Sequence, residues 1–471
     1  MTSRFSFRAP AILSAALGAA LLLSGCGSPI MDTIGDWFST SHKSNLRGLR
    51  VSLIGSDEDL QVDPGIATAP VVLPAPFRNP DWPQPGGYSS NAMYHLEAPG
   101  PLREVWSADA GKGTDDDSML TAPPVVGGGR IYVLDAEAHI RVFRLADGRP
   151  VWDKRLAPKN GTDMPTLWGL LGKPNTIDPP TGMGGGVAYD DNKIFVTSGF
   201  GVVHAMDAAT GKDIWSRTLG LPIINAPVVK DGRIFVSTHD NHFYAIAESD
   251  GRVLWEHQAI TEPASLLAST SAAVSGEFVL APFTSGELYA FRVQNGQAAW
   301  SDVLSRTGHV TQLSEIDAIA GRPVIDRDMV FATSQSGITV GINLATGDRV
   351  WAKNIGGIQT PWVAGDYLYV VDNASHLICL TRKEGKIRWI HQLPEYGDPE
   401  KKRYPILWAG PVLVSNKLIV VSSTGYAEAV SPYTGRLLGR VEIPDGAYIA
   451  PIVANGTLYI YTNDAELVAL R

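Results

Sequence analysis

A short motif recurs six times along this chain and limits its possible folds more than any other feature. The fullest copy, Asp207 to Trp215, reads Asp-Ala-Ala-Thr-Gly-Lys-Asp-Ile-Trp. In every copy the glycine lies four residues before the tryptophan. The pairs are Gly148 and Trp152, Gly211 and Trp215, Gly251 and Trp255, Gly296 and Trp300, Gly347 and Trp351, and Gly385 and Trp389. Repetition at matched spacing indicates an array of similar structural units.

Each unit has the pattern of antiparallel β-structure. Asp, Asn or Thr before Gly marks a tight turn, because Gly adopts a positive φ without a steric clash. The residues before the turn alternate in polarity as in a strand, for example Phe243 to Ile246. The third repeat, Ala226 to Trp255, therefore divides into four short strands. The tryptophan ends the fourth strand, where its ring can wedge between packed sheets.

The repeats number eight, and the last one is incomplete. First strands are expected near Ala122, Gly185, Ala226, Ala272, Arg322, Thr360, Gly410 and Ala450. The seventh repeat has Gly439 where the tryptophan should stand, and the eighth stops at Arg471 before its fourth strand. Residues 103–106, Arg-Glu-Val-Trp, supply a strand with no hairpin before it. We therefore predict an all-β fold, an eight-bladed β-propeller of four-stranded antiparallel blades, with an N-terminal strand completing the last blade and closing the ring.

Composition fits this fold and excludes one class of partner. The 48 glycines and 32 prolines suit a turn-rich all-β chain. The net charge is −9, and without residues 1–25, which hold Arg4 and Arg8, it is 37 − 48 = −11. An acidic chain without a basic run is a poor binder of nucleic acid.

Residues 1–25 have the pattern of a secretory signal. Two arginines precede an apolar run from Ala9 to Leu23, which is short for a membrane span. The run ends in Leu-Ser-Gly-Cys at residues 23–26, which resembles the bacterial lipobox and implies acylation of Cys26; the alternative is a plain secretory signal. Gly27, with no Asp there, resembles lipoproteins sorted to the outer membrane. We expect a signal peptide at 1–25, a lipidated tether and Pro-rich extension at 26–100, and the propeller at 101–471.

Two further features lead to structural expectations. The Pro-rich stretch 69–85 reads as extended chain, and we expect residues 79–87 to lie on the propeller surface with Trp82 as an anchor, rather than to be disordered. Cys379 lies in an apolar strand, which favours a buried, unreactive thiol. His239 and His242 flank Asp-Asn, which is turn chemistry, and no third metal ligand is evident.

Strand direction predicts which face of the ring carries function. The links between strands two and three, and from each blade to the next, lie on one face. That face receives the long, variable segments 154–183, 256–271, 301–321 and 391–409. Binding residues in scaffolded folds concentrate on such loops, so the blade-link face is the predicted working face.

Three segments of these links are candidate contacts. Glu315 and Asp317, near Leu313, form an acidic pair that points one way in extended chain and could meet Arg or Lys on a partner; a solvated loop is the alternative. Leu266 and Leu267 suit either an interface or the core. The run at 167–171, Leu-Trp-Gly-Leu-Leu, is expected to pack on its own loop.

The Asp-x-x-Thr-Gly-x-x-x-Trp repeat resembles the pyrroloquinoline-quinone-type propeller repeat over residues 103–471. Quinoprotein dehydrogenases of this type hold a redox cofactor and calcium and typically carry an adjacent Cys-Cys pair, which this chain lacks. The chain is more similar to the BamB family, in its lipobox, tether, eight blades and an end inside the last blade. That resemblance implies a non-enzymatic scaffold lipoprotein of the outer-membrane β-barrel assembly (BAM) complex, without a cofactor.

The family's contacts are implied at two blade links. Its acidic Asp-x-Asp after Leu-Ser resembles residues 313–317, with Glu315 in place of the first Asp. Its Leu/Arg segment falls on residues 265–268, where Ala268 replaces the Arg. By resemblance, Leu266, Leu267, Leu313, Glu315 and Asp317 bind the POTRA domains of BamA, beside other BAM subunits and unfolded outer-membrane proteins. The chain is then lipid-anchored on the periplasmic face of the outer membrane, with no catalytic or metal-binding residue. The alternatives are a quinone-dependent periplasmic dehydrogenase and a ligand-binding cell-envelope propeller with an aromatic-lined central pocket.

Overall fold

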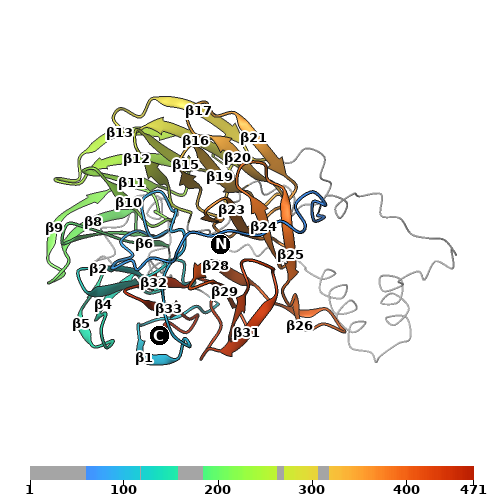
Figure 1. The fold of residues 1–471 in the computed structure, drawn as a ribbon. Coiled ribbons are helices and arrows are strands. Elements are labelled where there is room, and N and C mark those ends of the chain that lie inside the picture. Colours follow the sequence, from blue (N-terminus) through green and yellow to red (C-terminus); the bar gives the residue numbers. More distant parts are fainter. Residues whose placement is uncertain (1–59, 117, 157–183, 262–269, 306–317) are drawn as a thin grey trace, which may run out of the picture. The chain divides into compact units, whose positions relative to one another are not determined.

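The computed structural model describes residues 60–116, 118–156, 184–261, 270–305 and 318–471. These residues form strands and turns, and the strands assemble into eight four-stranded antiparallel sheets and one small hairpin (Figure 1). The prediction of an eight-bladed propeller is confirmed. Among the residues described, no helix has the length and apolar character that a membrane span requires.

The first four blades follow one another along the chain. Blade 1 is β2 (Val125–Gly127), β3 (Arg130–Leu134), β4 (His139–Arg144) and β5 (Pro150–Arg155); blade 2 is β6 (Gly185–Asp190), β7 (Lys193–Ser198), β8 (Val202–Asp207) and β9 (Asp213–Thr218); blade 3 is β10 (Val228–Lys230), β11 (Arg233–Ser237), β12 (His242–Ala247) and β13 (Val253–Gln258); blade 4 is β14 (Ala273–Ser275), β15 (Phe278–Pro282), β16 (Glu287–Arg292) and β17 (Ala298–Val303).

The remaining blades complete the ring. Blade 5 is β18 (Val324–Asp326), β19 (Met329–Thr333), β20 (Thr339–Asn343) and β21 (Arg349–Lys353); blade 6 is β22 (Trp362–Ala364), β23 (Tyr367–Val371), β24 (His376–Thr381) and β25 (Ile387–Gln392); the hairpin β26 (Tyr396–Asp398) and β27 (Arg403–Pro405) follows; blade 7 is β28 (Trp408–Val414), β29 (Lys417–Ser422), β30 (Tyr426–Val430) and β31 (Leu437–Glu442); blade 8 is β32 (Ile452–Ala454), β33 (Thr457–Tyr461), β34 (Glu466–Leu470) and β1 (Glu104–Asp109).

Blade 8 joins the two ends of the propeller. β1 pairs antiparallel with β34, so that Trp106 stands opposite Ala469. Arg103 and Arg471 exchange two backbone hydrogen bonds of 2.9 Å. The C-terminus therefore lies beside β1 (Figure 1), as the missing fourth strand of the last repeat predicts.

The glycine and tryptophan of the repeat form the contact between neighbouring blades. The ring of Trp300 in blade 4 lies over Gly347 in the turn of blade 5, where an added Cβ would come within 2.6 Å of it. The Trp300 indole N–H donates to the carbonyl of Leu344 in the same turn at 2.8 Å. The other tryptophans of the repeat donate in the same way to the next blade, to the carbonyls of Ala208, Glu248, Val293, Arg382 and Pro432. Each turn glycine is thus required both by its positive φ and by the ring above it.

Ring closure explains why the seventh repeat lacks its tryptophan. Its next neighbour is blade 8, whose third and fourth strands come from opposite ends of the chain and share no hairpin turn. A tryptophan at Gly439 would have no turn glycine to cover, and a Cβ added there would meet nothing within 4 Å. The tryptophan of blade 8, Trp106, covers Gly148 of blade 1, and its ring centre lies 5.7 Å from that of Tyr459.

The Pro-rich extension docks on the propeller, as expected, but its path extends much further than Trp82. Residues 77–98, which we call the inner belt, contact all eight blades in ring order. The belt and blade partners are Asn79 with Val453 and Asn455 (blade 8), Trp82 with Val126 (blade 1), Pro83 with Tyr189 (blade 2), Gln84 with Val229 (blade 3), Ser89 with Val274 (blade 4), Ser90 with Ile325 (blade 5), Tyr94 with Trp362 (blade 6) and Leu96 with Leu413 (blade 7).

The inner belt closes on itself and is held by the inner strands. Phe77 donates its N–H to His95 at 2.9 Å, and Glu97 donates to Phe77 at 2.8 Å. Trp82, 3% exposed, exchanges two backbone hydrogen bonds with Val126 on β2. The first strand of each blade has a free edge toward the ring centre, so the belt satisfies backbone groups that have no partner strand.

Two other expectations concern single residues. Cys379 is fully buried, as predicted, and burial raises the pKa of its thiol. His242 hydrogen-bonds the hydroxyl of Tyr244 at 3.0 Å and stacks on its ring. Among the residues described, no group of three or more His, Cys, Asp or Glu side chains is arranged to hold a metal ion.

Candidate functional site

The predicted working face is formed as the strand directions require. In seven blades the residue after the fourth strand donates its N–H to the link between strands two and three of the same blade. The donors are Leu156, Leu219, Ala259, Leu304, Leu393, Ile443 and, in blade 8, Ala110. Blade links and two-to-three links therefore share one face of the ring.

All five predicted partner-binding residues lie outside the described residues. Leu266 and Leu267 fall in 262–269, and Leu313, Glu315 and Asp317 fall in 306–317. Cys26 and the run 167–171 also lie outside them. The structure does describe residues that flank the segments 262–269 and 306–317.

Described residues that flank the segments 262–269 and 306–317 meet at blade 4. Ile260, which precedes 262–269, donates its N–H to the Glu287 carboxylate at 3.3 Å. Leu304, which precedes 306–317, donates to Gly286 at 2.8 Å, and Ile319, which follows that segment, donates to Phe283 at 3.4 Å. Residues 283–286 form the link between β15 and β16, and Glu287 is the first residue of β16. Residues 283–287 thus contact described residues that flank both segments.

A buried asparagine strengthens these contacts. Asn241, 3% exposed, donates to the carbonyl of Ile260 at 2.6 Å and accepts from the hydroxyl of Thr284 at 2.9 Å. Asn241 comes from the His-Asp-Asn-His stretch weighed for metal binding. Its observed role is to tie the link of blade 3 to that of blade 4.

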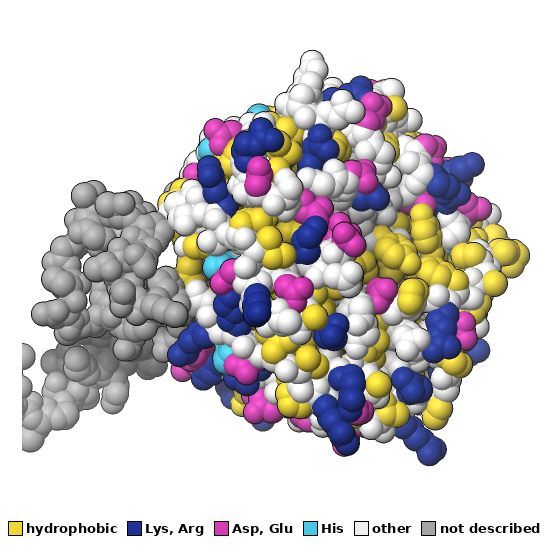
Figure 2. Space-filling view, turned by 90° about the vertical axis from the view of Figure 1, so that its left-hand side faces the viewer, with side chains coloured by type: hydrophobic (Ala, Val, Ile, Leu, Met, Phe, Trp, Pro, Cys, Tyr) yellow, Lys and Arg dark blue, Asp and Glu magenta, His cyan; other side chains and the backbone are white. Residues whose placement is uncertain are grey.

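Sequence reasoning missed several exposed apolar side chains on the blade links. Ile260 is 61% exposed, Tyr404 on the hairpin β26–β27 is 71% exposed, and Leu407 is 51% exposed. Apolar side chains also gather at one side of the space-filling view, whereas acidic and basic ones are interspersed over the rest (Figure 2). The length of the link 391–409 was the only sequence signal for the hairpin.

A cavity of about 540 Å³ lies at the centre of the ring. Its walls come from the blade links that lead into the first strands of blades 1, 5, 6, 7 and 8, and they carry Trp362, Trp408 and Tyr448. The inner belt contributes Trp82 and Asn91. The cavity is thus partly lined with aromatic residues, as a ligand-binding propeller predicts.

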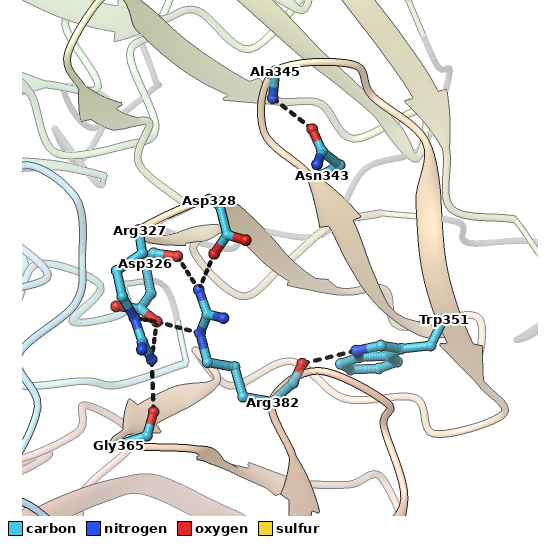
Figure 3. Close-up of polar contacts among 8 residues, drawn as sticks. All are labelled: Asp326, Arg327, Asp328, Asn343, Ala345, Trp351, Gly365 and Arg382. Atoms are coloured by element: carbon cyan, nitrogen blue, oxygen red, sulfur yellow. Dashed lines mark hydrogen bonds and ion pairs between the residues drawn. The ribbon is translucent and has the colours of Figure 1, made fainter.

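A charged cluster on the other face of the ring is structural. Arg382, 1% exposed, pairs with the buried carboxylate of Asp326 and with Asp328 at 2.7 Å, while its own carbonyl accepts the indole N–H of Trp351 (Figure 3). The hydrogen bond from Arg382 lowers the pKa of Asp328. All these contacts join blade 5 to blade 6, so the cluster holds two blades together.

Comparison with known proteins gives a consistent family likeness. The family model described as "Outer membrane protein assembly factor BamB" matches residues 165–391. Relatives of that name include those of Moranella endobia, 22% identical over 78% of this chain and 90% of the relative, and Yersinia pestis, 23% identical over 78% and 88%. A third, from Shewanella oneidensis, is 25% identical over 78% and 88%.

Solved structures share the fold at low identity. BamB from Moraxella catarrhalis matches with a TM-score of 0.62 and 15% identity, over 79% of this chain and 99% of that one. A europium-containing methanol dehydrogenase matches with a TM-score of 0.63 and 14% identity, over 81% and 89%. At such identities these likenesses show the fold alone, and they do not separate scaffold from dehydrogenase.

Proposed function

We propose that this BamB-like propeller is a non-enzymatic scaffold lipoprotein of the BAM complex, which binds POTRA domains of BamA and aids the insertion of outer-membrane proteins. The curated relatives named as outer-membrane protein assembly factors support the accessory role. The described residues that flank segments 262–269 and 306–317 and meet at blade 4 support a protein-binding face there.

The proposed anchor is a lipid on Cys26, which holds the protein at the periplasmic face of the outer membrane. The lipobox-like residues 23–26 support this position. Cys26→Ser is expected to abolish labelling by radioactive palmitate and to release the protein from the membrane fraction. Labelling that persists in the variant would contradict lipidation at Cys26.

The proposed contact residues are Glu315 and Asp317, with Leu313, Leu266 and Leu267 beside them. The observation that carries this choice is that three described residues flanking the two segments, Ile260, Leu304 and Ile319, contact residues 283–287. A surface that combines carboxylates with leucines suits a partner with Arg or Lys beside apolar groups.

The test is a pull-down of the mature protein, without lipid, by BamA POTRA domains. Wild type is compared with Glu315→Lys/Asp317→Lys. The matched control, Asp348→Lys/Glu384→Lys, makes the same change of charge in exposed turns on the other face of the ring. We expect wild type and the control to bind, and the Glu315/Asp317 variant to lose at least about tenfold in affinity.

Each result has a definite meaning when all proteins show the same circular dichroism. Equal loss in both variants indicates a general charge effect and rejects the chosen residues. Binding by all three keeps the function and rejects the residues. No binding by wild type rejects the BamA proposal, and an absorbance scan for a bound quinone then tests the dehydrogenase alternative.

We further propose that the outer edge of blade 7 accepts extended client strands. All six residues of β31 are exposed, and Leu437, Leu438 and Val441 are 48%, 54% and 49% exposed. A free strand edge with apolar side chains suits β-augmentation. Leu438→Lys/Val441→Lys is expected to weaken binding of an unfolded outer-membrane protein, whereas Val151→Lys/Ile214→Lys on the edges of blades 1 and 2 is not.

A further inference from the structure

The central cavity has different structures at its two ends. The blade links that form its walls lie on the working face and lead into the first strands. The inner belt crosses the inner strands further along, and its residues Trp82, Pro85, Gly86 and Asn91 line the cavity. The cavity is therefore lined by blade links toward the predicted working face and by the inner belt further along the inner strands.

One wall of this pocket carries an uncompensated cation. Arg322 lies just before β18 and lines the cavity. Among the residues described, none forms an ion pair or hydrogen bond with its guanidinium, and its Nε is buried without a partner. Burial lowers the pKa of Arg322 to about 10, so the group still carries its charge at neutral pH.

The contrast with Arg382 shows how unusual this is. Arg382 is 1% exposed and two carboxylates, Asp326 and Asp328, compensate its charge, whereas the partly exposed Arg322 has no such partner among the described residues. A buried charge without a partner destabilises a fold, and proteins retain such groups chiefly where they bind something.

Other polar atoms around the pocket also lack partners. The Gln335 Oε1, Trp82 Nε1 and Asn91 Oδ1 atoms are buried and make no hydrogen bond within the described protein. Thr360, whose hydroxyl accepts from the Arg322 backbone at 3.2 Å, stands beside them. Three aromatic side chains complete the wall. Convergent polar groups in a mostly apolar pocket of this size are typical of a small-molecule site.

We propose that the central pocket binds a small organic carboxylate with an aromatic or apolar body, its carboxylate on Arg322 and its body against Trp362, Trp408 and Tyr448. Arg pairs with carboxylate through a planar, two-point geometry. Indole and phenol rings supply broad apolar contact for the remainder of the ligand. This proposal does not depend on the proposed binding of BamA.

The first experiment measures binding of matched pairs of probes to the full mature protein. Phenylacetate, indole-3-acetate and 2-naphthylacetate are each compared with the corresponding primary amide by titration calorimetry. We expect at least one acid to bind about tenfold or more tightly than its amide. Arg322→Gln is expected to remove this preference, whereas Arg217→Gln, at an exposed position on β9, retains it.

The second experiment separates a binding role from a structural role. In buffer without probe, Arg322→Met is expected to raise the melting temperature by about 1–3 °C, because it removes a charge that no described residue compensates. Arg382→Met, which breaks an ion pair and leaves Asp326 buried, is expected to lower it. A clear fall in Arg322→Met would show that the arginine supports the fold and would overturn the proposal. Equal affinity for acids and amides, or no binding by any acid, would overturn it as well.

Discussion

At the residue scale, the turn glycine and the strand tryptophan are two halves of one contact between different blades. The sequence shows them four residues apart in one hairpin and does not say which tryptophan contacts which glycine. In the structure Trp300 instead covers Gly347 of the next blade, and its own glycine, Gly296, lies under Trp255. Spacing could predict that both residues matter, but the partner of each is decided by how the blades pack.

Three glycines differ in two requirements for glycine: a backbone with positive φ, and the lack of space for a side chain. Gly347 has a φ of 79° and Trp300 within 2.6 Å of an added Cβ; Gly276 has a φ of 56° and open space; Gly439 has open space and no positive φ. A positive φ costs a non-glycine residue about 1–2 kcal/mol, and overpacking adds about 1–3 kcal/mol. We expect Gly439→Ala to have the highest free energy of unfolding, Gly276→Ala a lower one and Gly347→Ala the lowest, as measured by denaturant titration. A different order would mean that the tryptophan yields to the new methyl group.

Two histidines of blade 6, His376 and His391, are expected to make stability depend on pH in opposite ways. The Asp372 carboxylate, which accepts a hydrogen bond from the Nδ1–H of His376 at 2.8 Å, raises the pKa of His376, whereas burial lowers the pKa of His391. The contribution of His376 is therefore present below about pH 6.5 and lost as the pH rises through its folded-state pKa. His391 is more stable in the fold as the neutral imidazole, because burial disfavours its charged form. Protonation therefore lowers the stability of the protein as the pH falls below about 6.5.

Melting temperatures of His376→Gln and His391→Gln at pH 5.5 and 8.5 test this pair. Relative to wild type, His376→Gln is expected to be more destabilised at pH 5.5 than at pH 8.5. His391→Gln is expected to compare better with wild type at pH 5.5 than at pH 8.5. The same pH profile for both variants would contradict the assignment.

At the scale of elements, the inner belt was predictable in part. Proline content and Trp82 correctly predict an extended segment docked on the propeller. Its circuit of the ring was not predictable, because extended chain has no periodicity and its hydrogen bonds go to backbone groups of the inner strands. The four strands of each blade, by contrast, follow from alternation and turns; in blade 3 the first strand, expected near Ala226, begins at Val228, and the strand expected at Phe243 begins at His242.

The belt is expected to contribute to the stability of the blades it joins. Asn91 donates to the carbonyls of Ala272 in blade 4 and Pro323 in blade 5, at 3.2 and 2.8 Å. Asn91→Ala leaves both carbonyls unpaired and is expected to cost about 1–3 kcal/mol. Ser→Ala at Ser216, an exposed position on β9, serves as the control. Hydrogen exchange should show faster exchange at Val274 and Ile325, whose N–H groups bond the belt; unchanged rates would mean that the belt does not hold these strands.

At the scale of the whole molecule, eight blades and their closure were predictable, because the last repeat lacks a strand that the N-terminal end supplies. The five candidate contact residues stay predictions, because they lie outside the described residues; residues that flank their segments lie at blade 4. The pocket could not have been found from sequence. Arg322 followed by Pro323 looks like an ordinary link, and only the ring brings it beside Trp408, Tyr448 and the belt.

Because β1 closes the ring by pairing with β34 in blade 8, we expect the ring to open first at that blade. Ala469 lies between Tyr459 and Trp106 in the middle of that sheet, as Ala290 lies between Leu280 and Trp300 in blade 4. Proline in a central strand removes a hydrogen bond of the ladder. Ala469→Pro is expected to release β1, so that trypsin cuts after Arg103 in the otherwise folded protein. Ala290→Pro should not produce this cut, and its appearance in both variants would point to general unfolding.

The inner belt and β1 also impose an order in time. These segments lie near the beginning of the chain, yet their partners include Leu413, Val453 and β34, which are synthesised last. A ribosome or a translocon delivers residues in sequence order, so neither the circuit nor the ring can be completed until the final blade has emerged. The early segments must then stay extended and unpaired throughout delivery, a requirement that a proline-rich composition meets.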